Sequence, residues 1–139
     1  MSDIKDQIKD LAQQFFTDTV NFRRTLHQNP ELSFEEYATS AFVQDYLHQL
    51  GIPFEQMANT GVVGYIKGDR PSDKVIALRA DMDALPIQEV EGRVYGSQNP
   101  GIMHACGHDV HTSSLLGVAR ILQALKAEFG GTIKLIFQP

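Results

Sequence analysis

The spacing of apolar residues predicts three amphipathic helices. Apolar side chains recur every three or four positions over residues 3–24, 38–50 and 115–129. This spacing is typical of helices that pack one stripe of side chains against a core. The stripe of the first helix consists of Ile4, Ile8, Leu11 and Phe15.

The second helix has boundary signals at both ends. In the segment Ser33-Phe34-Glu35-Glu36, the Ser33 hydroxyl can accept from the Glu36 amide while the Glu36 carboxylate accepts from the Ser33 amide, which forms a capping box. At the other end, Gly51 offers a left-handed cap and Pro53 cannot continue a helix. These signals predict a helix between them.

Three short runs of β-branched and aliphatic residues predict strands. Residues 62–67 and 74–80 are separated by the turn-forming segment 68–73, and a last run covers residues 132–137 after a Gly-Gly pair. Residues 75–78 are all apolar, which favours a strand that is buried on both faces.

A long segment without clear periodicity, residues 81–111, joins the second predicted strand to the third helix. A loop of this length inside a compact domain is usually functional. Strand, loop, helix and strand in this order form a right-handed crossover of an α/β sheet. We therefore expect an α/β fold with a central sheet and flanking helices, and no domain boundary within residues 1–139.

The charge balance excludes some classes of partner. Twelve Lys and Arg stand against 17 Asp and Glu, a net charge of -5, which has the wrong sign for a protein that neutralises nucleic-acid phosphates. The acidic first residues do not form a signal peptide, and no apolar run approaches the ~18 residues of a membrane span. We expect neither a nucleic-acid nor a membrane partner. A lone cysteine, Cys106, fits the reducing cytoplasm.

Two carboxylates, Asp81 and Asp83, follow the second predicted strand. If the strand geometry continues, alternation places both on one side, where like charges repel unless a cation or a proton lies between them. The pair therefore favours a cation site. The alternative is a solvated turn that happens to carry two acids.

The segment from Met103 to His111 is rich in metal-ligand types, with three of the five histidines, the only cysteine and an aspartate. Thiolate and imidazole are good ligands for zinc, and Gly107 allows a tight turn through which Cys106 and His108 can face one ion. The positive end of the helix that follows favours the thiolate form. The spacing predicts a metal site at Cys106 and His108.

Other roles for these residues remain open at this point. Cys106 can instead be a small core residue, His111 can interact only with the helix start, and His104 can lie on the surface. Cys106 can also be a nucleophile with a histidine as its base, although a histidine two positions away seldom reaches the sulfur in the right geometry. The distant His27 is an alternative base, but its position before the second helix favours a structural role.

The sequence from Arg23 onward resembles the M20 metallopeptidases. Within that family it is similar to the amidohydrolase branch, which includes N-acyl-amino-acid amidohydrolases, hippurate hydrolases and auxin-conjugate hydrolases. The resemblance is carried by residues 27–33, 79–86, 103–111 and 136–139. Their order and combined length make chance agreement very improbable.

The resemblance implies roles for individual residues. It makes Cys106 and His108 metal ligands and matches Asp83 to the acid that supports catalysis beside the metal. Asp81 takes a place that is a ligand histidine in other branches, so its role is left open. Further residues that can support the site are His104, Asp109 and His111. The implied cofactor is one or two divalent ions, zinc or manganese.

The implied reaction is metal-dependent hydrolysis of the amide bond in N-acetyl or aromatic-acyl amino acids. In the family, a metal-polarised water attacks the amide carbon and a glutamate accepts its proton. That glutamate and further ligands follow a Phe-Gln-Pro strand, whereas this sequence stops at Phe137-Gln138-Pro139. The resemblance therefore implies the N-terminal portion of a metallo-exopeptidase-type catalytic domain, without the dimerisation domain and the C-terminal part.

Two expectations follow for the isolated chain. Loss of the base alone should lower the rate by about 10²–10⁴, so we expect the chain to be nearly inactive. We also expect self-association through an unpaired sheet edge near residues 132–137. The alternatives are a non-catalytic α/β module with a partial metal site and a cysteine-dependent hydrolase that uses Cys106.

Overall fold

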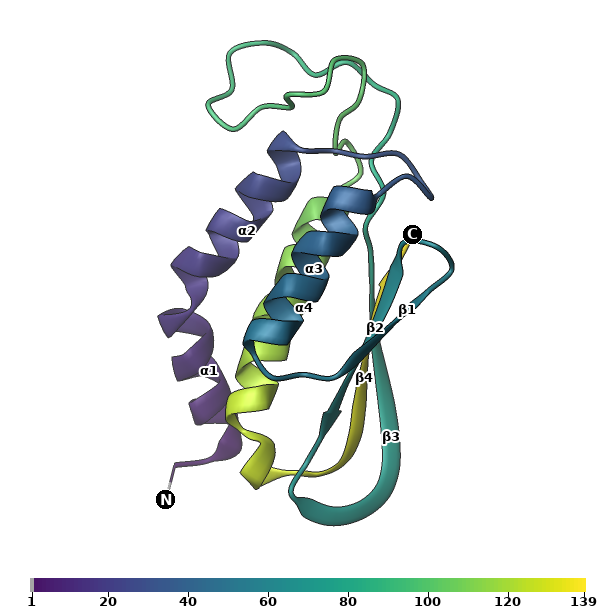
Figure 1. Ribbon diagram of the computed structural model, residues 1–139. Helices are drawn as coiled ribbons and strands as arrows, with labels where there is room; N and C mark the ends of the chain where they lie inside the picture. Colours follow the sequence, from purple (N-terminus) through teal and green to yellow (C-terminus); the bar gives the residue numbers. More distant parts are fainter. Residues whose placement is uncertain (1) are drawn as a thin grey trace.

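The computed structural model describes residues 2–139, so Met1, the first residue of the acidic N-terminal segment, lies outside the described residues. Its centre is a four-stranded sheet with the order β1-β2-β4-β3 (Figure 1). The strands are β1 (Phe54–Met57), β2 (Gly61–Lys67), β3 (Arg70–Asp81) and β4 (Gly130–Gln138). Pairing is antiparallel for β1 with β2 and for β2 with β4, and parallel for β3 with β4. The α/β class is confirmed.

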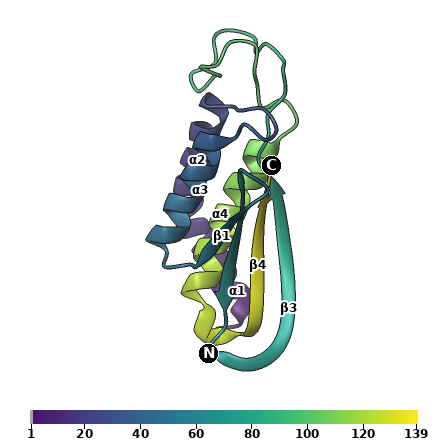
Figure 2. The ribbon, with the colours of Figure 1, turned by 45° about the vertical axis from the view of Figure 1, so that its right-hand side comes forward.

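The helices lie on one side of the sheet (Figures 1 and 2). They are α1 (Ile4–Gln14), α2 (Phe16–Gln28), α3 (Tyr37–Gln49) and α4 (His108–Ala124), with a 3₁₀ turn at Lys126–Glu128. Helix α3 packs on β2 and α4 packs on β3, while α1 and α2 lie outside them against α4. Among the described residues, none of these helices is long and apolar enough to cross a membrane.

The hydrophobic core fills the space between the sheet and the two inner helices. Six of its completely buried members are Val43, Leu47, Val62, Leu116, Leu135 and Phe137. They come from α3, α4, β2 and β4, so the apolar stripes predicted for residues 38–50 and 115–129 do face the core. Burying a side chain of this size contributes about 1.5–3 kcal/mol.

The prediction of one continuous helix over residues 3–24 was wrong, because the chain breaks at Phe15 into α1 and α2. Phe15 is buried, with the Arg120 guanidinium 3.7 Å from the centre of its ring. On α1, by contrast, Ile4 and Ile8 are 36% and 38% exposed. Phe15 packs with Ile121 of α4 and with Leu125, the residue that follows α4. Because these partners are distant in sequence, the local spacing of apolar residues does not predict the break.

The predicted capping box at Ser33 and Glu36 was also wrong. The Glu31 carboxylate caps α3 instead, since it accepts from the amides of Ala38 at 3.0 Å and Thr39 at 2.6 Å. Phe34 has a positive φ of 63°, which turns the chain before the helix begins at Tyr37. The predicted end is confirmed, because Gly51 has a φ of +71°.

Glu36 is completely buried, and its Oε2 accepts from Thr60 Oγ1 at 2.6 Å while Oε1 has no partner among the described residues. Burial raises the pKa of this carboxyl against the opposing effect of the Thr60 bond. A carboxyl whose pKa is raised on folding contributes stability at low pH that is lost as the pH rises through the folded pKa.

Replacing Glu36 by Gln is therefore expected to stabilise the fold at pH 8 and to have little effect at pH 4, because the amide cannot ionise. Urea unfolding at the two pH values measures this difference. The matched control is Glu35→Gln, which changes an exposed neighbour and should leave the free energy of unfolding almost unchanged. The expected result is a larger difference in the free energy of unfolding between Glu36→Gln and the unsubstituted chain at pH 8 than at pH 4. An equal difference at the two pH values would contradict it.

Strand β3 is an edge strand, so the prediction that residues 75–78 are buried on both faces was wrong. Val75 and Ile76 are 58% and 61% exposed, because helices cover only one face of the sheet and β3 pairs only with β4 among the described residues. Strand β4 is paired on both sides, so the unpaired edge expected near residues 132–137 lies at β3 instead. The sequence also did not predict the short, largely exposed strand β1.

The parallel pairing of β3 and β4 confirms the predicted crossover through α4. Asp81 lies opposite Gln138 in this register, so both strands end at the same edge of the sheet. The loop from Met82 to Gly107 leaves this edge and leads back to it at the start of α4. The candidate residues therefore gather where β3 ends and α4 begins.

Candidate metal centre

The backbone at the start of α4 places its first side chains beside the end of β3. Gly107 is the N-cap residue and has a left-handed φ of 92°, which glycine adopts without steric cost. His108 and His111 follow at a spacing of three, so they project from the same face of α4. Thr112 Oγ1 donates to the Asp81 carbonyl at 2.7 Å and holds the helix against the strand end.

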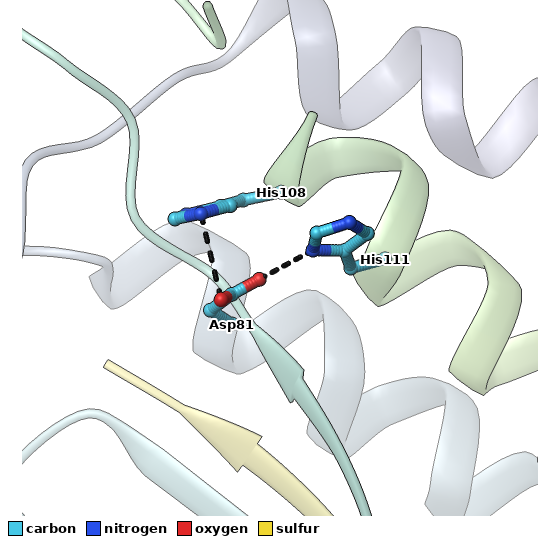
Figure 3. Close-up of side chains that lie close together, drawn as sticks. All are labelled: Asp81, His108 and His111. Carbon is cyan, nitrogen blue, oxygen red and sulfur yellow. Dashed lines mark hydrogen bonds and ion pairs between the residues drawn. The ribbon is translucent and has the colours of Figure 1, made fainter. Parts of the chain in front are cut away.

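Asp81 lies between the two histidines (Figure 3). Its Oδ1 is 2.7 Å from His111 Nδ1, and its Oδ2 is 3.4 Å from His108 Nε2. One ligand atom from each of the three residues can be chosen such that all lie within 4.8 Å of one another. We refer to Asp81, His108 and His111 as the metal cluster.

The other ring nitrogen of His108 fixes its tautomer. His108 Nδ1 lies 2.8 Å from Asp83 Oδ1 and 3.0 Å from the Asp83 carbonyl oxygen. Because the carbonyl can only accept, Nδ1 carries a proton, and in the neutral ring the Nε2 lone pair then faces Asp81. Histidines that bind metals are commonly held in this way by a carboxylate on the second nitrogen.

The electrostatics of Asp81 favour a cation. Burial alone would raise the pKa of this carboxyl, but the hydrogen bond from His111, and the attraction of the two histidines in their protonated forms, outweigh it, so the pKa lies below its usual value. Asp81 is therefore ionised at neutral pH. A carboxylate beside an imidazole lone pair matches the ligand preferences of zinc and manganese, so the residues fit a divalent ion.

Cys106 and His108, the two ligands predicted from the sequence, are not both in this cluster. Cys106 is exposed, so the alternative that it is a small core residue is wrong, and its role as a ligand stays a prediction. Asp83 lies where it can orient His108. The cation site expected at Asp81 and the ligand-rich segment 103–111 thus meet at one place.

A second polar cluster lies buried beside the first turn of α4. His27 Nδ1 is 2.7 Å from Asp109 Oδ2, and His27 Nε2 is 2.8 Å from Glu89 Oε1. Arg23 Nε donates to the same Asp109 oxygen at 2.9 Å. Carboxylate oxygens therefore face both ring nitrogens of His27. We refer to Arg23, His27, Glu89 and Asp109 as the buried ion cluster.

In this cluster carboxylates face both nitrogens of His27, which leaves none free to act as a base for Cys106. The cluster connects α2, the long loop and the first turn of α4, and Asp109 directly follows His108 in the chain. Spacing could not reveal Glu89, which is 62 positions from His27. The only sequence signal was the length of the loop that carries it.

His104 is buried, so the alternative that it lies on the surface is wrong. Neither of its ring nitrogens has a hydrogen-bond partner among residues 2–139. Burial lowers its pKa to about 4, although Asp109 opposes this shift. His104 is therefore neutral at pH 7, and its ring centre lies 6.4 Å from that of His27.

Comparisons with known proteins find one family model and several relatives. Residues 77–139 match the profile of peptidase family M20/M25/M40. The chain is 45% identical over 135 residues to an N-acyl-L-amino acid amidohydrolase of Geobacillus stearothermophilus, a match that covers 96% of this chain and 36% of the relative. It is 47% identical over 127 residues to an N-acetylcysteine deacetylase of Bacillus subtilis, which covers 90% and 33%.

Solved structures give the same result. The YXEP protein of Bacillus subtilis, described as a dinuclear metal binding peptidase from the M20 family, matches with a TM-score of 0.86 and 45% identity over 91% of this chain and 36% of that one. A putative aminohydrolase of Staphylococcus aureus matches with a TM-score of 0.92 and 38% identity, covering 96% and 34%. This chain spans about a third of the length of these relatives.

Proposed function

Because the chain belongs to peptidase family M20/M25/M40, we propose that it forms part of an enzyme that hydrolyses the amide bond of N-acyl amino acids with a divalent metal ion. Two relatives are named for the removal of acyl groups from amino acids. The substrates would be small N-acetyl or aromatic-acyl amino acids. The lone cysteine supports a cytoplasmic location, because disulfides are rare in reducing compartments.

The observation that carries this proposal is the orientation of His108 by Asp83 toward the Asp81 carboxylate. His108 Nε2 and Asp81 would hold a divalent ion here, while Asp83 keeps the proton on His108 Nδ1. A bound ion would supply Lewis-acid chemistry to a carbonyl oxygen and to water. His111 is close enough to add a third donor.

Cys106 is proposed as a further ligand, together with His108, and the ion as zinc or manganese. The exposed sulfur lies two positions before His108, and a thiolate beside an imidazole suits zinc. His104, which is buried in the loop, and Asp109, which is buried in the first turn of α4, are proposed as supporting residues. One or two ions are proposed for the complete enzyme, because a related structure is described as a dinuclear metal binding peptidase.

The 139 residues are proposed to supply the front part of the catalytic domain, with the general base and further ligands coming from elsewhere in the enzyme. A chimera tests this directly. The matching segment of the Geobacillus amidohydrolase, which is 45% identical, is replaced by this chain. We expect the chimera to hydrolyse N-acetyl and N-benzoyl amino acids and to lose activity with a chelator, while the chain alone is slower by at least about 10²–10⁴.

His108→Ala in the chimera is expected to abolish turnover, and His48→Ala, on the exposed face of α3, serves as the matched control. Circular dichroism shows whether each variant is folded. A folded chimera without chelator-sensitive hydrolysis would contradict the proposed function. If the isolated chain hydrolysed these substrates at ordinary enzyme rates, the proposal that the general base and further ligands come from elsewhere in the enzyme would be wrong.

A cysteine-dependent hydrolase is the second candidate, because Cys106 is exposed. It predicts that alkylation of Cys106 abolishes hydrolysis by the chimera while a chelator has no effect. The engagement of both His27 nitrogens by carboxylates counts against it. A non-catalytic module with a partial site predicts no hydrolysis with either treatment.

A further inference from the structure

A second candidate site lies on a different face of α4 from the metal cluster. A hollow of about 310 Å³ opens between α2, α4 and the long loop. Its wall on α4 includes Val110 and Ser114, whereas His108 and His111 project toward the end of β3. The volume is at the lower end of the range for ligand sites, about 300–1,000 Å³, which selects a small ligand.

Three guanidinium groups gather around one aromatic ring at this hollow. The Cζ atoms of Arg23 and Arg24 are each 5.1 Å from the centre of the Tyr95 ring, and that of Arg93 is 5.6 Å away. Cations are attracted to the face of such a ring, but they also repel one another. Arg23, Arg24 and Tyr95 line the hollow itself.

The carboxylates nearby do not balance these charges. Arg23 pairs with Asp109, and Arg93 lies 3.7 Å from Glu89, but these same two carboxylates also contact the ring nitrogens of His27. Among residues 2–139, Arg24 has no ion-pair partner within 4.0 Å. Arg23 and Arg93 thus share their two carboxylates with His27, while Arg24 has none, in a chain whose net charge is -5.

The donors that remain point to the class of ligand. Arg23 uses Nε toward Asp109. Within residues 2–139, its two terminal nitrogens and the whole Arg24 guanidinium have no hydrogen-bond partner. Guanidinium groups bind carboxylates through paired hydrogen bonds. Apolar side chains complete the hollow, contributed by Phe16, Val20 and Val110.

We propose that this hollow binds a small monocarboxylate with an apolar or aromatic body, with the carboxylate on Arg24 and Arg23 and the body against Phe16, Val20 and Val110. The site is independent of the metal cluster. It also does not require the proposed amide hydrolysis, since its residues are held by α2, α4 and the loop.

Titration calorimetry with benzoate tests the site, using the metal-free chain so that the metal cluster does not contribute. We expect benzoate to bind, and Arg24→Gln to weaken binding by about tenfold, because one charge-assisted pair is lost. The matched control is Arg70→Gln, which removes an exposed arginine paired with Glu128 elsewhere and should leave the affinity unchanged. His108→Ala should also bind benzoate normally.

Two further probes separate the contributions of charge and apolar body. Benzamide, which has the same ring without the charge, is expected to bind about tenfold more weakly. Inorganic phosphate is also expected to bind more weakly than benzoate, because it does not use the apolar wall. The proposal would be overturned if Arg24→Gln bound benzoate as tightly as the unsubstituted chain does. It would also be overturned if phosphate or benzamide bound as tightly as benzoate, or if benzoate did not bind at all.

Discussion

Asp109→Asn is expected to lower the free energy of unfolding by about 3–5 kcal/mol, the usual effect of removing one partner from a buried ion pair. Asp109 and His27 are each only 1% exposed, and one Asp109 oxygen accepts from both His27 and Arg23. Asparagine keeps the shape of the side chain but not its charge. Arg23 would then lose its ion-pair partner, and His27 would keep only its contact with Glu89.

Urea unfolding of the metal-free chain measures this effect, and a variant too unstable to unfold cooperatively would be the extreme case of the same result. Asp18→Asn is the matched control. It breaks the ion pair of Asp18 with Arg120, in which the Asp18 side chain is 53% exposed, and exposed pairs contribute about 0–1 kcal/mol. A loss below about 1 kcal/mol for Asp109→Asn would show that the buried ion cluster does not stabilise the fold.

His108→Ala is expected to weaken zinc binding by more than a hundredfold, because residues that merely orient a ligand already contribute about 10–100-fold. His108 offers the one nitrogen whose lone pair is fixed by a neighbour, through the 2.8 Å contact with Asp83. Asp83→Asn should therefore produce the smaller loss, about 10–100-fold, by freeing the ring. Titration calorimetry with zinc measures both variants.

His48→Ala is the control for this series, since His48 lies exposed on α3 and should leave zinc affinity unchanged. Circular dichroism confirms that each variant remains folded. If His108→Ala and His48→Ala bound zinc equally well, the metal cluster would not be the binding site.

Local patterns predicted the elements whose apolar faces pack directly on the core. The stripes over residues 38–50 and 115–129 and the strand at residues 62–67 were identified because each buries one regular face. The break at Phe15 and the capping of α3 by Glu31 were not, since both depend on contacts made after the chain folds. The exposure of Val75 likewise depends on where β3 lies in the sheet.

The candidate site was predictable in parts but not as a whole. Asp81 and Asp83 indicated a cation, and the segment with Cys106 and His108 indicated a metal. These two segments lie side by side because the parallel crossover brings the end of β3 beside the start of α4. Neither segment predicts this arrangement from its own sequence. No local sequence pattern marked Glu89 as part of a cluster, because its partner His27 belongs to α2, a different element.

The most direct test is an anomalous difference map from crystals of the chain grown with zinc. We expect a peak at the end of β3, at the bonding distance of about 2.0–2.2 Å from His108 Nε2 and an Asp81 oxygen. Density that continues from this peak to the Cys106 sulfur would support the third ligand as well. A peak elsewhere with none beside His108, for example at the buried ion cluster, would contradict the assignment of this site.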